Sequence, residues 1–158
     1  MFQESKSDNG IEREQRENMR PSISVIMPLY NAARFLEETL TSVSNQVFQN
    51  YELLCINDGS DDDTVDIVKK FQDNDCRIKL FNNNGHMGAA IARNTGLQVA
   101  SGRFIAYLDA DDLWKEEKLE KQINFMLKNR YAFTCTDYEK IDEKGNSLNK
   151  IVKIPEKV

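Results

Sequence analysis

Short apolar runs alternate with helical patterns along most of this chain, and this alternation limits the folds that it can adopt. Four runs have the length and the branched or aromatic content of β-strands: residues 23–29, 51–56, 77–81 and 103–108. After the first run, apolar residues recur at the spacing of one helix face: Leu36, Leu40, Val43 and Val47. Strands that alternate with helices over short connections favour an α/β fold with a mainly parallel sheet flanked by helices.

Two further helices are expected between the later strands. Ser60 and Asp63 fit a capping box, which predicts a helix that continues through about Phe71. The helix before the fourth strand carries three small residues on one edge: Ala92, Gly96 and Ala100. Because side chains this small allow close approach, we expect this edge to lie against the sheet.

The last part of the chain is expected to add a helix, a strand and a hairpin. Four apolar residues mark the amphipathic helix: Leu119, Ile123, Met126 and Leu127. A fifth strand is predicted at residues 131–136. A turn at 142–146 then leads into a last strand at 148–154.

The composition fits one soluble domain. The chain has 158 residues, 40% of them hydrophobic and 30% charged, and its net charge of −5 does not favour a nucleic-acid partner. It contains no run of 18 apolar residues, so no membrane-spanning helix is expected. Residues 1–21 are polar and lack the apolar stretch of a secretory signal. We expect a disordered arm there and one domain over residues 22–158.

The cysteines favour a reducing compartment. Cys55, Cys76 and Cys135 are odd in number and do not have the spacing of a zinc site. Cys55 and Cys135 lie in apolar runs and are expected to be reduced core residues. Together with the acidic composition, this pattern predicts a cytoplasmic protein.

Polar segments follow three of the predicted strands, at residues 28–31, 57–59 and 109–111. In open parallel sheets, ligands bind in the crevice outside the carboxyl ends of the strands. We therefore expect these three segments to form one ligand site.

The segment YLDADDLW (107–114) carries the densest charge of the site. Asp109 and Asp111 point the same way in an extended chain and could bind a hard cation such as Mg²⁺ or Mn²⁺ through carboxylate oxygens. The alternative is a solvated helix N-terminus, where aspartate is also favoured, and Asp112 fits this role best.

Other residues have two interpretations each. Asp58 could accept a hydrogen bond from an N–H of uracil, thymine or guanine, or it could belong to an ordinary Asp-Gly turn. Arg93 could hold a diphosphate or form a structural ion pair. His86 is expected to be solvated in a loop. Tyr30 and Trp114 could stack on a ligand ring or belong to the core.

Several phosphate-binding folds are excluded or disfavoured. The first strand is not followed by G-x-G-x-x-G, and the chain has no G-x-x-x-x-G-K-[ST]. The segment DADDL resembles the motif of aspartyl-phosphate phosphatases, which would form a phosphoaspartate at Asp109. Leu113, however, stands where that motif has Thr or Val, and the segment follows a late strand. No glycine falls where an EF-hand loop requires one.

Four motifs in order resemble the nucleotide-binding half of a family 2 glycosyltransferase with the GT-A fold, a Rossmann-like α/β fold. They are SVIMPLYNAARFLEETLTSVSNQ, YELLCINDGSDDDT, NNGHMGAAIARNTGL and GRFIAYLDADDLW, between Ser22 and Tyr138. The resemblance implies a set of substrate-binding residues: Pro28, Tyr30, Asp58, Arg93, Asp109, Ala110 and Asp111. Within this set, Tyr30 would lie near the base and Asp58 would accept its N–H. Asp111 would bind the metal, and Asp109 would contact the ribose or the metal's water shell.

The resemblance also implies a reaction and its partners. The activity is metal-dependent inverting transfer from a nucleoside-diphosphate sugar, expected to be a UDP-sugar, to a saccharide or lipid-linked acceptor in polysaccharide biosynthesis. Such an enzyme could associate peripherally with the inner face of the membrane. The family's general base comes from a segment downstream of the D-x-D half, and we expect this truncated chain to lack it and the acceptor-binding part. The alternative is a sugar-nucleotide-binding module without turnover.

Overall fold

The computed structural model describes residues 20–154, which form two compact units divided between Glu117 and Lys118. The predicted disordered arm, residues 1–21, lies outside the described residues except for its last two positions. Within residues 20–154, no helix is long and apolar enough to cross a membrane.

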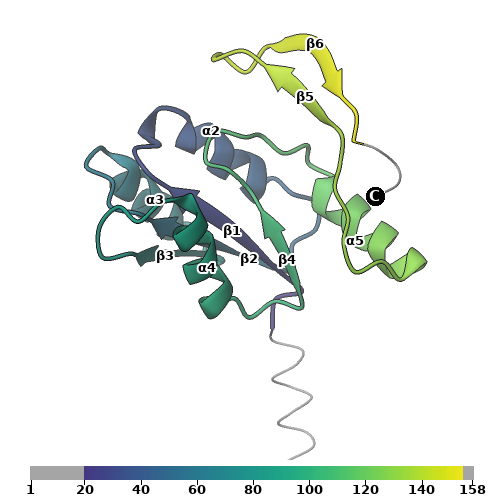
Figure 1. Cartoon of the computed structure of the whole chain (residues 1–158), viewed down its shortest axis with the longest axis horizontal. Helices are drawn as coiled ribbons and strands as arrows, with labels where there is room; N and C mark the ends of the chain where they lie inside the picture. Colours follow the sequence, from purple (N-terminus) through teal and green to yellow (C-terminus); the bar gives the residue numbers. More distant parts are fainter. Residues whose placement is uncertain (1–19, 155–158) are drawn as a thin grey trace, which may run out of the picture. The chain divides into compact units, whose positions relative to one another are not determined.

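The first unit is built on a four-stranded parallel sheet in the order β3-β2-β1-β4 (Figure 1). The strands are β1 (Ile23–Leu29), β2 (Tyr51–Asn57), β3 (Ile78–Asn82) and β4 (Phe104–Tyr107), and every neighbouring pair is parallel. All four predicted strands are thus confirmed to within two residues at each end. The chain runs from β1 to β3 in one direction and then places β4 on the other side of β1.

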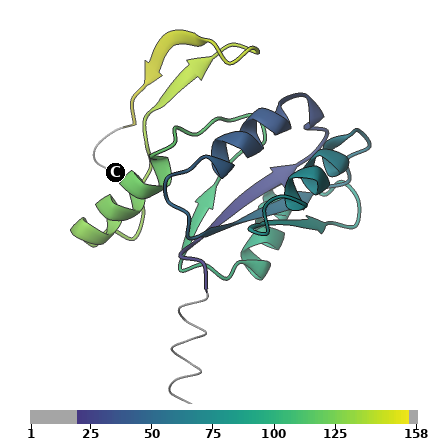
Figure 2. The ribbon, with the colours of Figure 1, turned by 180° about the vertical axis from the view of Figure 1, so that it is seen from behind.

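Three helices cover this sheet: α2 (Ala33–Ser44), α3 (Thr64–Gln72) and α4 (Ala89–Val99). Figures 1 and 2 show α4 on one face of the sheet and α2 and α3 on the other. The central strand β2 is buried along its whole length because helices cover both faces. The predicted mainly parallel sheet flanked by helices is confirmed.

The small-residue edge of α4 lies against the sheet, as predicted. Ala92 and Gly96 are buried, and α4 packs against β1 and β2. A Cβ built at Gly96 would overlap Cγ2 of Ile26 in β1. Glycine is therefore required at this position by close packing rather than by an unusual φ.

Two details of the helix predictions are wrong. Val47 does not belong to the buried face of α2: the helix ends at Ser44, and Val47 is 51% exposed while its N–H donates to the carbonyl of Glu116. The capping box of Ser60 and Asp63 does not form either, since Asp63 precedes α3 without a side-chain cap. The neighbouring Asp62 takes this role, because its carboxylate accepts the N–H of Thr64 at 3.0 Å.

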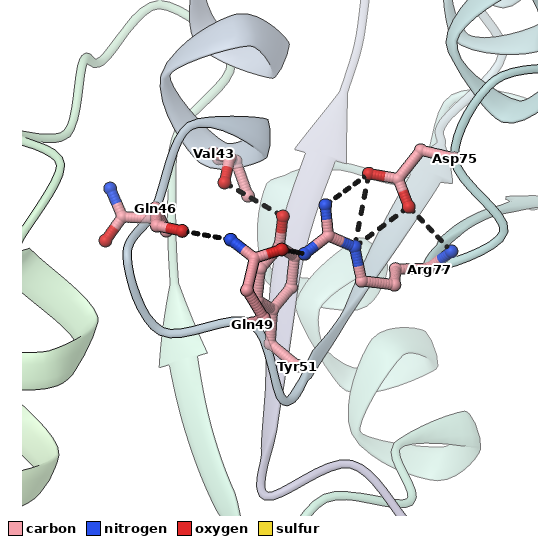
Figure 3. Close-up of polar contacts among 6 residues, drawn as sticks. All are labelled: Val43, Gln46, Gln49, Tyr51, Asp75 and Arg77. Atoms are coloured by element: carbon pink, nitrogen blue, oxygen red, sulfur yellow. Dashed lines mark hydrogen bonds and ion pairs between the residues drawn. The ribbon is translucent and has the colours of Figure 1, made fainter.

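An arginine-centred network ties together the amino ends of β2 and β3 (Figure 3). The Arg77 guanidinium donates to the Asp75 carboxylate at 2.7 and 2.9 Å and lies 4.4 Å above the Tyr51 ring. Tyr51 in turn donates its hydroxyl proton to the carbonyl of Val43 in α2 at 2.9 Å. Burial raises the pKa of Tyr51 to about 12. These contacts lie at the end of the sheet opposite the predicted ligand edge.

The second unit contains α5 (Lys118–Asn129) and an antiparallel hairpin of β5 (Tyr138–Ile141) and β6 (Ser147–Val152). The predicted helix and hairpin turn are confirmed, and Gly145 has φ +76° in that turn. Leu119 and Ile123 are buried, whereas Leu127, predicted on the same helix face, is 51% exposed.

The predicted strand at residues 131–136 is wrong. No strand is assigned over these residues, and Phe133 is 80% exposed. Cys135, expected in the core, is exposed as well, whereas Cys55 is buried as predicted. An apolar run becomes a strand only where a neighbouring strand pairs with it, and in the described part of the chain none pairs with this run.

Candidate functional site

A cavity of about 490 Å³ opens at the carboxyl ends of β1 and β4. This is the point where the strand order reverses, because β2 lies on one side of β1 and β4 on the other. The cavity lining includes every predicted substrate-binding residue: Pro28, Tyr30, Asp58, Arg93, Asp109, Ala110 and Asp111. Residues that are far apart in the sequence are therefore brought to one place, as the strand-end argument predicted.

The loops after β1 and β2 are bound to each other. Asn31 has φ +48°, its N–H donates to Ser60 Oγ at 3.1 Å, and its side-chain oxygen accepts the Asp61 N–H at 3.0 Å. This tight turn leaves the Tyr30 ring at the cavity, 49% exposed. An aromatic ring that lines a cavity can stack on a planar ligand.

Asp58 is the most buried charged residue of the cavity, with 2% exposure. Its carboxylate accepts hydrogen bonds from Asn83 Nδ2 at 2.7 Å and from the N–H groups of Met87 at 2.9 Å and Gly88 at 2.7 Å. Burial would raise the pKa of Asp58, but these hydrogen bonds and the nearby His86 hold it below its usual value. The carboxylate therefore fastens the loop at 83–88 to the end of β2.

The alternative of an ordinary Asp-Gly turn does not describe Asp58. The side chain that bonds to this turn is that of Asn57, whose Oδ1 accepts the Ser60 N–H at 3.0 Å. Gly59, with φ +82°, lies so close to the 83–88 loop that an added Cβ would be 2.9 Å from His86 N. The Asp58 side chain thus bonds across to the 83–88 loop and not within its own turn.

His86 belongs to the site, although the sequence predicted a solvated loop residue. Its Nδ1 lies 3.0 Å from Asp58 Oδ2, and its ring stacks on Tyr30 with centroids 3.8 Å apart and planes at 26°. The side chain keeps 53% exposure. The position of the loop in the sequence could have indicated that His86 lies at the site. The loop follows β3, whose carboxyl end lies beside that of β2.

The acidic segment after β4 has a cationic partner within the chain. Arg93 Nη2 donates to Asp109 Oδ1 at 2.5 Å, so both interpretations of Arg93 remain compatible with its place at the cavity. The turn itself is held by Thr39, whose hydroxyl donates to the carbonyl of Ala110 at 2.9 Å. An arginine thus offsets part of the repulsion among the three carboxylates.

Asp112 does not lie at a helix N-terminus, since α5 begins only at Lys118. Burial and the charges of Asp111 and Asp109 raise the pKa of Asp112 above its ordinary value. The proposed role of Trp114 as a ring-stacking residue is not supported either. Trp114 lines a separate depression beside α2 and is not part of the 490 Å³ cavity lining.

The donor set of the cavity fits a hard divalent cation. Asp109 and Asp111 both line the cavity and offer only carboxylate oxygens, which Mg²⁺ and Mn²⁺ prefer. In residues 20–154, no group of three or more histidine, cysteine or acidic side chains is arranged to hold a metal by itself. One or two carboxylates are the protein share expected where phosphate oxygens and water complete the coordination.

The fold and the cavity define an α/β protein with a cavity at the carboxyl ends of parallel strands, where open sheets of this kind bind their ligands. The model of glycosyl transferase family 2 matches residues 24–156, and the chain belongs to that family. Its fold is the GT-A fold.

Named relatives agree with this assignment. The chain is 46% identical over 136 residues to the Escherichia coli UDP-Glc:alpha-D-GlcNAc-diphosphoundecaprenol beta-1,3-glucosyltransferase WfgD, covering 86% of this chain and 52% of that one. S. aureus TarS 1–349, solved in complex with UDP-GlcNAc, is 29% identical with a TM-score of 0.66, over 69% of this chain and 32% of that chain. The chain spans about half the length of the curated relatives it matches.

A more distant structure shows the same fold. It is the Pyrobaculum calidifontis mannosyltransferase PcManGT, solved in complex with GDP-Man and Mn²⁺. The TM-score is 0.64 at 24% identity, over 82% of this chain and 41% of that one.

Proposed function

We propose that this chain is the donor-binding part of a metal-dependent inverting glycosyltransferase that uses a UDP-sugar. The observation that carries the proposal is the single cavity in which Tyr30 and Asp58 meet the D-x-D pair Asp109 and Asp111. The names of two relatives support it, since WfgD is described as using UDP-Glc and TarS was solved with UDP-GlcNAc.

The base is assigned to the Tyr30 and Asp58 end of the cavity. Tyr30 offers an exposed ring on which a pyrimidine can stack, and Pro28 lines the same end. The Asp58 carboxylate is ionised, so it accepts an N–H but does not donate. Uracil, thymine and guanine carry such an N–H and cytosine does not, and among the three the names of WfgD and TarS favour uracil.

The diphosphate and the metal are assigned to the opposite end. Asp111 and Asp109 would hold Mn²⁺ or Mg²⁺, which as a bound Lewis acid stabilises the charge on the departing nucleoside diphosphate. Arg93 orients the Asp109 carboxylate through its 2.5 Å hydrogen bond and carries a planar cation suited to phosphate oxygens. Ala110 lies between the two aspartates and carries only a methyl group.

The acceptor completes the proposal. We assign a saccharide or a lipid-linked saccharide as acceptor, in polysaccharide biosynthesis on the cytoplasmic side of the membrane, to which the enzyme would bind peripherally. WfgD supports the lipid-linked class, since its name specifies a diphosphoundecaprenol-linked sugar. No residue of this chain is assigned as the general base.

The first prediction concerns the metal. Calorimetric titration of UDP should show binding that Mn²⁺ strengthens roughly ten- to a hundredfold, because the cation links two carboxylates to the diphosphate. Asp111→Ala should abolish the strengthening. Asp112→Ala is the matched control, since Asp112 does not line the cavity, and it should keep the Mn²⁺ effect. Equal affinities with and without Mn²⁺ in the unmodified protein would refute the metal assignment.

A sugar-nucleotide-binding module without turnover is the second candidate. One observation favours it: the carboxylates that line the cavity are Asp58, Asp109 and Asp111, and each already has a proposed binding role. The measurement that separates the two candidates is acceptor-dependent release of UDP from a UDP-sugar. Release by this chain supports the transferase, and donor binding without release supports the module.

A further inference from the structure

His86 makes two contacts that the proposed function assigns to the nucleoside base. Its imidazole stacks on the Tyr30 ring, with centroids 3.8 Å apart and an interplanar angle of 26°. Its Nδ1 lies 3.0 Å from Asp58 Oδ2. A uracil ring in the assigned position would use the same aromatic face and the same carboxylate, because it is planar and presents an N–H at its edge.

The imidazole of His86 and a uracil ring cannot make these two contacts at the same time. An aromatic face accommodates one ring at stacking distance, and His86 already covers the face of Tyr30 on its side. Asp58 also has little capacity left, since it accepts three hydrogen bonds and is 2% exposed. Oδ1 accepts Asn83 Nδ2, whereas Oδ2 accepts both backbone N–H groups and lies 3.0 Å from His86 Nδ1. The His86 contact is thus the third on Oδ2, and it is the contact that a base N–H would replace.

We propose that His86 occupies the place of the base in the ligand-free protein, and that a nucleotide binds by displacing this imidazole from Tyr30 and Asp58. The inference rests on the proposed function, since it requires that the base binds at these two residues. It makes His86 a specificity-determining residue. Only a base with an N–H toward Asp58 replaces the imidazole without loss of a partner for the buried carboxylate.

The construction of the loop allows this exchange. Asn83, Met87 and Gly88 hold the loop to Asp58 through one side-chain amide and two backbone N–H groups, none of which belongs to His86. The His86 side chain is 53% exposed and can rotate toward solvent while these three bonds remain. The loop therefore stays in place, and only the imidazole moves.

The displacement has a measurable cost for the ligand. If the closed arrangement of His86 dominates in the free protein, the apparent affinity is lowered by the fraction of molecules that are open. His86→Ala should therefore bind UDP about three- to tenfold more tightly than the unmodified protein at the same Mn²⁺ concentration. Asn84→Ala is the matched control: this residue lies in the same loop, is exposed and is not part of the cavity lining, so the affinity for UDP should not change.

A spectroscopic test follows the imidazole directly. His86 is the only histidine among the 158 residues, so its ring signals in a proton–carbon spectrum need no assignment. Saturating UDP should move these signals toward those of a free histidine, because the ring leaves the Tyr30 face. Pyrophosphate with diamagnetic Mg²⁺, which probes the phosphate end alone, should leave them unchanged. CDP should bind more weakly than UDP to the unmodified protein.

The outcomes separate this inference from the proposed function. If UDP binds but His86→Ala binds it equally or more weakly, His86 is not displaced, and the inference is overturned while the donor site stands. Unmoved ring signals at saturating UDP would have the same meaning. If neither the unmodified protein nor His86→Ala binds UDP, both the donor site and the exchange are overturned. Binding by His86→Ala alone would support both.

Discussion

At the scale of single residues, the carboxylates of the cavity differ in what neutralises them. Asp58 is buried and is held by hydrogen bonds from a loop that follows another strand. Asp109 is more exposed and is paired with Arg93. A buried charge requires fixed partners, whereas an exposed one can exchange its partner for a ligand or a metal. Asp58 is therefore suited to organising the base end, and Asp109 to exchanging partners at the phosphate end.

Replacement of Asp58 tests this difference. Asp58→Ala should destabilise the protein by about 2–4 kcal/mol, because it leaves two backbone N–H groups and the Asn83 amide without their acceptor and detaches the 83–88 loop. Urea unfolding measures the change, and hydrogen exchange at Met87 and Gly88 locates it. The control Asp61→Ala removes an exposed carboxylate from the loop after β2, in which Asp58 also lies, and should change stability by less than about 0.5 kcal/mol. A similar loss in both variants would contradict the organising role of Asp58.

At the scale of elements, the position of α4 matters most for the site. This helix starts directly after the loop that bonds to Asp58 and carries Arg93 toward the cavity. Its distance from β1 is set by the absence of a side chain at Gly96, beside Ile26. The packing of one glycine thus fixes how far Arg93 lies from the end of β4.

Enlarging Gly96 tests this packing. Gly96→Val should cost about 1–3 kcal/mol of unfolding free energy, since the added atoms overlap Ile26 and the buried helix face cannot yield without moving. Thermal or urea unfolding provides the measurement. Gln98→Val, on the exposed face of the same helix, places the same branched side chain where it meets no neighbouring strand and should cost less than about 0.7 kcal/mol. Equal costs would show that α4 does not press against β1.

At the scale of the whole first unit, one buried carboxylate connects segments from every part of the sheet. Glu52 in β2 accepts hydrogen bonds from Ser24 in β1 at 2.6 Å, from Lys79 in β3 at 2.8 Å, and from Ser101 before β4 at 2.8 Å. Burial by itself would raise the pKa of Glu52, but these hydrogen bonds outweigh it and lower the pKa to about 2. The folded structure thus stabilises the ionised form of Glu52.

The pH dependence of stability follows from this shift. Because the folded pKa of about 2 lies below the ordinary value of 4.5, Glu52 stabilises the fold above pH 4.5 and loses this contribution as the pH falls toward 2. The full contribution is about 3 kcal/mol. Urea unfolding from pH 7 to 2 should show a smaller acid loss for Glu52→Gln, and the two proteins should converge near pH 2. Parallel curves would contradict the assignment.

Much of the fold and of the site could be predicted from the sequence. Strand and helix periodicity depends on neighbouring residues, so β1 to β4, the small edge of α4 and the hairpin turn were predictable from local pattern. The meeting of Tyr30, Asp58 and Asp109 was predictable as well, because parallel strands carry their carboxyl ends to one edge.

Only the tertiary structure decided which partners individual side chains and segments have. Asp58 bonds to the 83–88 loop, His86 stacks on Tyr30, and residues 131–136 find no strand to pair with in the described chain. Each of these depends on which distant segment lies within a few ångström, and local periodicity carries no information about that distance. The sequence by itself determined the elements and the edge at which the site lies, and the folded chain determined which side chains occupy it.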